Sequence, residues 1–122
     1  MTAIRISGKI NPTESSDKVR RAINNVFGDI DLIISEETFM AELDGYLSLR
    51  EFRVRIAQDK IRTTMKNVLT RWTNENRLSF GLNRQAAYAG HVSLNLQNED
   101  PMGPIQVEVE GDIDELVTFL TS

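Results

Sequence analysis

Apolar and polar side chains alternate over residues 4–10 at the start of the chain. A period of two is typical of a strand with one buried face. Pro12 ends this pattern, and Thr13 stands where a helix N-cap is expected. Apolar residues then recur at helical spacing as far as Phe27, and Gly28 suits the position that follows a helix. The chain is therefore predicted to open with a strand and one helix.

Two short apolar runs, at 31–35 and 39–43, are predicted to pair as a hairpin. The later patterns predict helices over 48–56, 61–72 and 112–120, strands over 78–83, 91–96 and 105–109, and an acidic Pro/Gly loop over 98–104. The resulting order is β-α-β-β-α-α-β-β-β-α. It lacks the regular strand–helix alternation of a doubly wound sheet. It therefore favours an α+β fold with a largely antiparallel or mixed sheet and helices on one face.

Composition narrows the class of protein. A chain of 122 residues with 40% hydrophobic side chains fits a single domain over residues 1–122. The chain has no cysteine, which excludes disulfides and thiolate metal sites and favours a reducing, cytoplasmic location. No apolar run approaches the ~20 residues that span a bilayer, so no membrane association is expected. The first residues read as a strand and not as a signal peptide.

Charge is distributed unevenly along the chain. The net charge is −4, but residues 45–77 carry eight basic and three acidic side chains, a net charge of +5. Residues 98–122 carry seven acidic side chains and no basic one. These charges could simply keep helix surfaces soluble, or the basic middle could bind an acidic partner.

The sequence offers little for catalysis. His91 is the single histidine, and a lone histidine without a surrounding motif is more often structural than catalytic. No spacing matches a known metal-binding or phosphate-binding loop. We therefore expect no enzymatic activity, no metal and no cofactor.

The basic middle segment is the candidate binding surface. Arg50 and Arg53 lie on the second predicted helix, and Arg62 and Lys66 share one flank of the third. They would form one patch if the two helices packed side by side, and phosphate groups are the natural ligands of such a patch. No preference for DNA is evident.

Residues 82–90, between two predicted strands, concentrate hydrogen-bonding side chains. Asn83, Arg84 and Gln85 stand together, and the guanidinium of Arg84 suits phosphate or carboxylate. In the alternative, Asn83 and Gln85 satisfy backbone groups of a loop, and Arg84 pairs with the acidic tail. Tyr46 and Tyr88 are expected in loops, but two scattered tyrosines do not define a platform on which bases could stack.

Four segments carry a family resemblance, which spans nearly the whole chain in order. They are Pro12-Thr13-Glu14, Ile61-Arg62-Thr63-Thr64, Leu82-Asn83-Arg84-Gln85-Ala86-Ala87 with Gly90, and Met102-Gly103-Pro104-Ile105. Together they resemble the archaeal Uncharacterised Protein Family 0201. Members more often have lysine at the position of Arg84 and leucine at that of Met102, and both changes are mild.

The resemblance implies an archaeal cytoplasmic source and an α+β fold similar to a ribosomal protein that binds 5S RNA. Family members are labelled as RNA-binding domains or named for a neighbouring dephospho-coenzyme-A kinase gene. The resemblance supplies no catalytic residues. Shared fold with an RNA-binding protein is an analogy and does not by itself assign a function.

Three hypotheses result. The first is a non-catalytic module that binds structured RNA or a ribonucleoprotein, with phosphate contacts from Arg50, Arg53, Arg62, Lys66 and Arg84. The second is a homodimeric interaction protein, in which the basic middle of one copy meets the acidic tail of another. The third is a small-molecule protein linked to coenzyme A metabolism.

Overall fold

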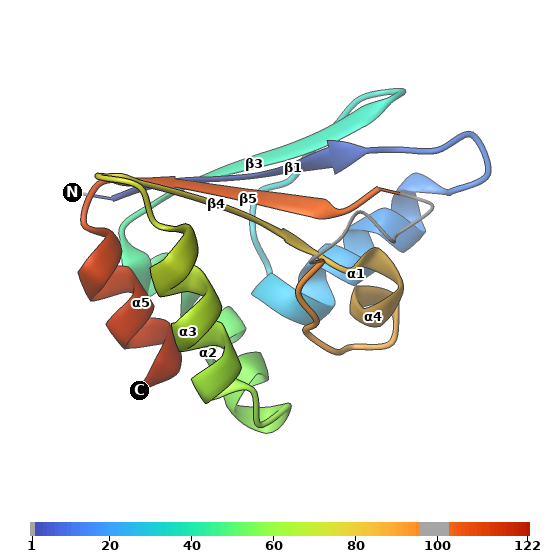
Figure 1. Ribbon diagram of the computed structural model, residues 1–122. Coiled ribbons are helices and arrows are strands. Elements are labelled where there is room, and N and C mark those ends of the chain that lie inside the picture. The colour runs from blue at the N-terminus through green and yellow to red at the C-terminus, as the bar shows by residue number, and fades with distance from the viewer. Residues whose placement is uncertain (1, 96–102) are drawn as a thin grey trace.

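Strands from distant parts of the chain form one antiparallel sheet, and the helices pack beneath a single face of it (Figure 1). The computed structural model describes residues 2–95 and 103–122. In chain order the elements are β1 (Ala3–Lys9), α1 (Ser16–Phe27), β2 (Ile33–Ile34), β3 (Thr38–Asp44), the 3-10 helix η1 (Tyr46–Leu49), α2 (Arg50–Gln58), α3 (Arg62–Trp72), β4 (Arg77–Leu82), α4 (Arg84–Tyr88), β5 (Ile105–Glu110) and α5 (Ile113–Thr121). The five strands lie in the order β2-β3-β1-β5-β4, which makes β1 the centre of the sheet.

Alternation along the strands separates a buried face from an exposed one. On β1, Ile4 and Ile6 are buried against the helices, whereas Ala3 and Arg5 point to the other side and are exposed. The neighbouring strands β3 and β5 follow the same alternation. The period of two in the sequence therefore fixes which side of the sheet faces the core.

The core lies between the sheet and the helices as one cluster of buried side chains. Phe52 of α2 lies at its centre, with its ring centroid 5.0 Å from that of Phe27 on α1 and 6.3 Å from that of Phe80 on β4. Helix α5 packs against both α2 and α3. Within residues 2–95 and 103–122, no helix is both long and apolar enough to cross a membrane.

The predicted α+β fold, with an antiparallel sheet and helices on one face, is confirmed. The 31–35 and 39–43 hairpin is also confirmed, as Ile33 pairs with Met40. The start of the first helix differs from the prediction, because the N-cap is Ser15, whose Oγ accepts a hydrogen bond from the Lys18 backbone N–H at 3.2 Å. The helix is displaced from Thr13 because Glu14 turns inward to a buried ion pair.

The segment between β4 and β5 differs most from the prediction. Residues 84–88 form the helix α4 where a loop was predicted. In the predicted strand 91–96, the described residues contribute one isolated bridge, between Leu94 and Leu82 at the end of β4. Residue 96 and residues 98–102 of the predicted acidic loop lie outside the described residues, as does Met102.

Candidate nucleic-acid interface

Arg84 is the most deeply buried charged side chain among the described residues, with 1% of its surface exposed. Its Nη1 donates to the Lys9 carbonyl oxygen at 2.6 Å and to Glu14 Oε1 at 2.7 Å. Its Nη2 donates to the Pro104 carbonyl oxygen at 3.4 Å. The guanidinium therefore ties the β1–α1 turn to α4 and to the entry of β5.

The Glu14 carboxylate accepts several further hydrogen bonds in this network. Besides Arg84, its carboxylate accepts from the Tyr88 hydroxyl and from the backbone and side-chain N–H groups of Asn11. Burial acts to raise the pKa of Glu14, but these hydrogen bonds and the charge of Arg84 outweigh it and hold the pKa below its ordinary value. The carboxylate is ionised at neutral pH and acts as a structural anchor.

Arg84 is thus unavailable to phosphate, and its proposed role as a phosphate contact was wrong. Among the described residues its ion-pair partner is Glu14, and the acidic residues 99 and 100 of the alternative lie outside the described residues. Asn83 caps α4, its Oδ1 accepting from the Ala86 backbone N–H at 2.9 Å, and Gln85 is exposed on that helix. Tyr88 is half-buried, and its hydroxyl donates to the Glu14 carboxylate. The loop motif is therefore a structural one.

Arg53 also differs from the expected role. It is half-buried between α2 and α5, with its guanidinium carbon 5.3 Å from the centre of the Phe119 ring. Its Nη2 donates to Ser122 Oγ at 3.3 Å, just beyond the carboxyl end of α5. A cation is favourable at that end of a helix, so Arg53 stabilises the packing of α5 on α2.

The other three predicted contacts are exposed. Arg50 begins α2, and Arg62 and Lys66 lie one turn apart on α3. Lys60, in the short connection between the two helices, is exposed as well. We call these four residues the basic helix surface. No carboxylate lies within ion-pair distance of any of them in the part of the chain that the structure describes.

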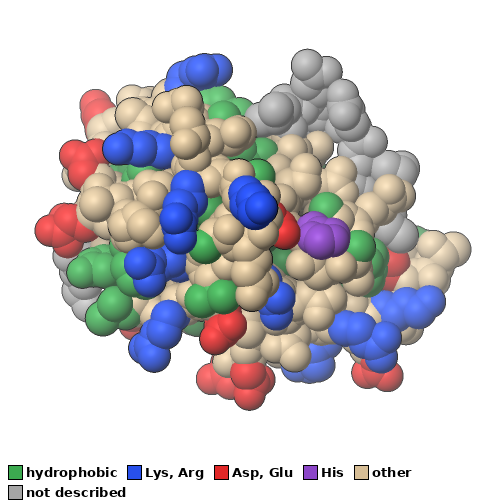
Figure 2. All heavy atoms as spheres, turned by 90° about the horizontal axis from the view of Figure 1, so that it is seen from below, with side chains coloured by type: hydrophobic (Ala, Val, Ile, Leu, Met, Phe, Trp, Pro, Cys, Tyr) green, Lys and Arg blue, Asp and Glu red, His purple; other side chains and the backbone are tan. Residues whose placement is uncertain are grey.

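Figure 2 views the helical side of the molecule from below. Several Lys and Arg side chains gather in the left half of this view, on the side where Figure 1 places α2, α3 and α5. A second group lies at the lower right, and most of the acidic side chains lie towards the rim. Helix α1 also carries exposed basic residues that were not predicted as contacts, namely Lys18, Arg20 and Arg21. Their spacing away from the buried stripe of that helix could have identified them.

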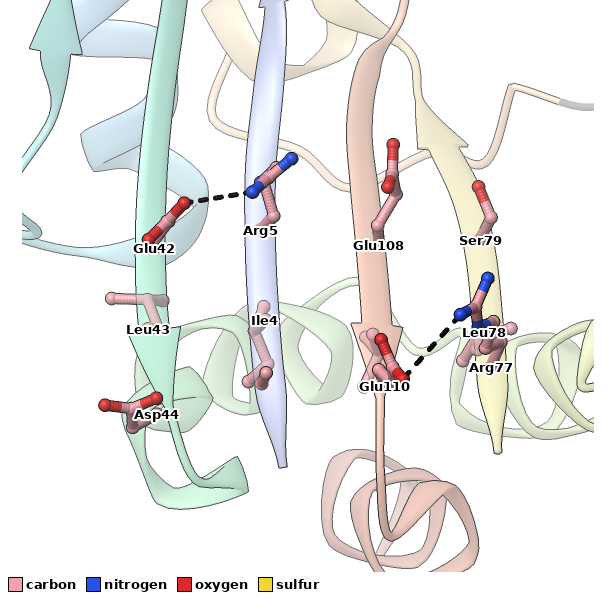
Figure 3. A pocket seen from close by; sticks show the side chains of 12 residues that line it. Ile4, Arg5, Glu42, Leu43, Asp44, Arg77, Leu78, Ser79, Glu108 and Glu110 are labelled. Carbon is pink, nitrogen blue, oxygen red and sulfur yellow. Dashed lines mark hydrogen bonds and ion pairs between the residues drawn. The ribbon is translucent and has the colours of Figure 1, made fainter. Parts of the chain in front are cut away.

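The opposite side of the sheet has another character. Its outward positions carry Arg5 and Arg77 in the ion pairs Arg5–Glu42 (3.1 Å) and Arg77–Glu110 (3.8 Å), shown in Figure 3. Glu108 lies between these pairs. Aromatic side chains are absent from the outward positions of the described strands. This face therefore lacks the rings on which sheet-type RNA-binding domains stack bases.

His91 has a structural partner at the surface. Its Nδ1 lies 3.1 Å from Asp59 Oδ1, and Asp59 Oδ2 accepts the Val92 backbone N–H at 2.7 Å. Burial acts to raise the pKa of Asp59, but the hydrogen bonds from Val92 and His91 outweigh it and leave the pKa lowered. The pair joins the end of α2 to the segment after α4. Across the described residues, no three His, Asp or Glu side chains are grouped to hold a metal ion.

Comparison with known proteins places the chain in a family. A family model described as RNA binding matches residues 3–111. A UPF0201 protein of Sulfurisphaera tokodaii is 34% identical, over 99% of this chain and 88% of its own length. One of Metallosphaera sedula is 33% identical, over 98% of this chain and 87% of its own length. The chain belongs to the UPF0201 family.

A solved structure supports the same assignment. The crystal structure of the UPF0201 protein from Methanococcus jannaschii is similar to this fold with a TM-score of 0.84 and 26% sequence identity. The similarity covers 98% of this chain and 99% of that one. The resemblance carried by the four sequence segments is therefore confirmed for the UPF0201 family.

The ion pair of this UPF0201 protein makes its stability depend on pH. Because the pKa of Glu14 is lowered on folding from an ordinary value of 4.5, the carboxylate stabilises the fold above that value, and this contribution is lost as the pH falls through the folded-state pKa. We expect Glu14→Gln to flatten the loss of stability between about pH 5 and pH 3. Urea unfolding at a series of pH values measures this. Glu115→Gln, at an exposed position of α5, is the control, and equal slopes in wild type and Glu14→Gln would contradict the assignment.

Proposed function

We propose that this protein is a non-catalytic, cytoplasmic module that binds structured RNA or a ribonucleoprotein through its helical side. The observation that carries the proposal is the basic helix surface of Arg50, Lys60, Arg62 and Lys66, which is exposed and has no intramolecular ion pair among the described residues. Exposed Lys and Arg side chains bind the phosphate backbone, and they release its condensed counterions. The family model's description as RNA binding supports the same partner.

The two sides of the sheet support the choice of the helical side. The outward sheet residues include Glu42, Asp44, Glu108 and Glu110, which would repel phosphate. The basic helix surface lies on the other side, in the segment of net charge +5. An RNA is therefore expected to approach the helices and not the strands.

Binding without catalysis is supported by the roles of the polar groups. Arg84, Glu14 and Tyr88 hold each other in the interior. His91 is engaged by Asp59. These are the groups that acid–base chemistry would use, and each has a structural task. The absence of cysteine supports the cytoplasmic location.

Fluorescence anisotropy with a labelled structured RNA tests the proposal. We expect binding at low salt that weakens steeply as salt is added, with a linear relation between the logarithms of affinity and salt concentration. If no structured RNA binds below about 100 μM at low salt, the proposal is wrong, since even nonspecific binding commonly reaches ~10⁻⁴–10⁻⁶ M. A hairpin RNA and a single strand of equal length distinguish binding of structure from binding of charge alone.

A further inference from the structure

The outer face of the sheet is a surface that the proposed RNA contact leaves unused. The described helices all lie on the other side of the sheet, so this face is open (Figure 1). A hollow of about 510 Å³ lies at one end of it, along β3, β1, β5 and β4 (Figure 3). Its charged side chains follow a regular pattern.

Charge alternates from strand to strand across this end of the face. The outward residues are Glu42 and Asp44 on β3, Ala3 and Arg5 on β1, Glu108 and Glu110 on β5, and Arg77 and Ser79 on β4. In the sheet order β3-β1-β5-β4, the strands are therefore acidic, basic, acidic and basic. If a second copy of this face is rotated so that its strand order is reversed, its acidic strands can face the basic strands of the first.

Two of the acidic groups on this face have no ion pair with any residue that the structure describes. Glu42 pairs with Arg5 and Glu110 with Arg77, but Asp44 and Glu108 have no ion-pair partner within the described part of the chain. The two existing pairs are exposed, and exposed pairs of this kind contribute little to stability. The arginines are therefore free to redistribute towards a second acidic group.

We propose that the outer sheet face binds a second copy of this chain, through a two-fold axis parallel to the strands and between β1 and β5. Such an axis reverses the strand order of the copy, so β1 faces the partner's β5 and β3 faces the partner's β4. Every acidic strand then meets a basic one. Two sheets packed face to face in this way keep nearly aligned strands, about 10 Å apart.

The register along the strands matches individual residues in this arrangement. Arg5 is level with Glu108, and Arg77, Glu110, Ala3 and Asp44 share the next row. Because the axis runs along the strands, each row faces itself. Arg5 therefore meets the partner's Glu108, and Arg77 meets the partner's Asp44. Asp44 and Glu108, the two acidic groups without an ion pair among the described residues, are therefore the two that this dimer would pair.

The facing side chains are complementary in length as well as in charge. In the same rows, Glu110 faces the partner's Ala3, and Glu42 faces the partner's Ser79. Long side chains therefore oppose short ones, and the hollow of about 510 Å³ provides room for them. Close complementarity of this kind is what specific interfaces require.

An uncharged row lies beside the charged ones. It runs across the sheet from Ile33 on β2 through Met40 and Ser7 to Gln106, each paired with the next. Ile33 is 65% exposed. β2 lies outside the four strands that face each other in this arrangement, so Ile33 stays at the edge of the interface. The alternative two-fold axis, perpendicular to the strands, would place each strand on the same strand of the partner, so that basic β1 faces basic β1 and acidic β5 faces acidic β5. The pattern therefore selects one arrangement of the two copies.

Charge reversal with sedimentation equilibrium tests this dimer independently of RNA. We expect the wild type to be dimeric at about 100 μM and low salt, above the micromolar constants of weak interfaces of ordinary size. Arg5→Glu and Glu108→Arg should each raise the dimer dissociation constant at least about a hundredfold, because two-fold symmetry repeats each like-charge contact. The combined Arg5→Glu/Glu108→Arg variant should restore much of the affinity.

Arg20→Glu on α1 and Glu115→Arg on α5 are matched controls at exposed positions, and they should leave the dissociation constant unchanged. A monomeric wild type under these conditions would overturn the proposal. So would single reversals that dimerise like the wild type, or a combined variant no better than the singles. If a single variant does not fold, the wild type and the combined variant still decide the question. RNA binding can succeed or fail without changing any of these outcomes.

Discussion

Replacing Arg84 by methionine is expected to lower the free energy of unfolding by about 3–5 kcal/mol, because it leaves the buried carboxylate of Glu14 without its cation. Methionine keeps much of the side-chain volume, so the loss reports on charge and hydrogen bonds more than on packing. The Lys9 and Pro104 carbonyl oxygens also lose a donor. Equilibrium urea unfolding at neutral pH gives the difference directly.

Two further variants separate the ion pair from general damage to the site. Arg84→Lys keeps the charge but cannot reproduce the forked contacts, so we expect an intermediate loss. Glu14→Leu combined with Arg84→Met removes both charges. The loss of unfolding free energy in this double variant should be smaller than the sum of the losses in the two single variants. A loss below about 1 kcal/mol in Arg84→Met would show that the buried pair does not anchor the fold.

Gly8→Ala is expected to cost about 3 kcal/mol, although it adds a single methyl group to the central strand. A Cβ at this position would lie 2.9 Å from Arg84 Nη2 and closer still to the ring of Phe39. The Arg84 guanidinium lies over the Phe39 ring, with 5.3 Å between the guanidinium carbon and the ring centre. Neither neighbour can move without disturbing the ion pair, so the glycine is required by the close approach of both.

Ser7→Ala is the matched control for this variant, because Ser7 is adjacent on β1 and faces the other side of the sheet. Its effect should stay within about 0.5 kcal/mol, as for most surface substitutions. Thermal or urea unfolding of both variants measures the contrast. Equal stabilities of Gly8→Ala and Ser7→Ala would refute the tight packing of Phe39 and Arg84 against β1.

The fold was largely predictable because periodicity reports local burial. The alternation on β1 and the apolar stripes of α1 and α3 identified both the elements and their buried faces. The helix α4 was missed because a helix of five residues is too short to show a period. Asn83 followed by two alanines was the signal, as a capping residue before good helix formers.

The candidate site was predictable only in part. Arg62 and Lys66 were correctly expected on an exposed flank of their helix, and exposure of Arg50 agrees with the prediction. The burial of Arg84 could not be foreseen, because its partner Glu14 lies 70 residues earlier in the chain. Arg53 sits at the border of the buried stripe, and only the position of α5 decides that it packs on Phe119. Local patterns do not contain these long-range contacts.

The outer sheet face illustrates the same limit. The acidic residues of β5 appeared in the sequence as part of an acidic tail. Pairing with β1 and β4 places Glu108 beside Arg5 and Glu110 beside Arg77. The stripes exist only once the strand order β3-β1-β5-β4 is known.

The most direct measurement of the central claim is RNA affinity in two triple variants with equal net charge. One is Arg50→Ala/Arg62→Ala/Lys66→Ala, in the basic helix surface, and the other is Lys18→Ala/Arg20→Ala/Arg21→Ala, on α1. We predict that the first weakens binding at least about tenfold and lowers the slope of affinity against salt by up to about 3, as expected for lost phosphate contacts. The α1 variant should stay within about threefold of the wild type, as electrostatic effects of distant charges are screened. Equal losses in both variants, or a larger loss from α1, would contradict an RNA contact through the basic helix surface.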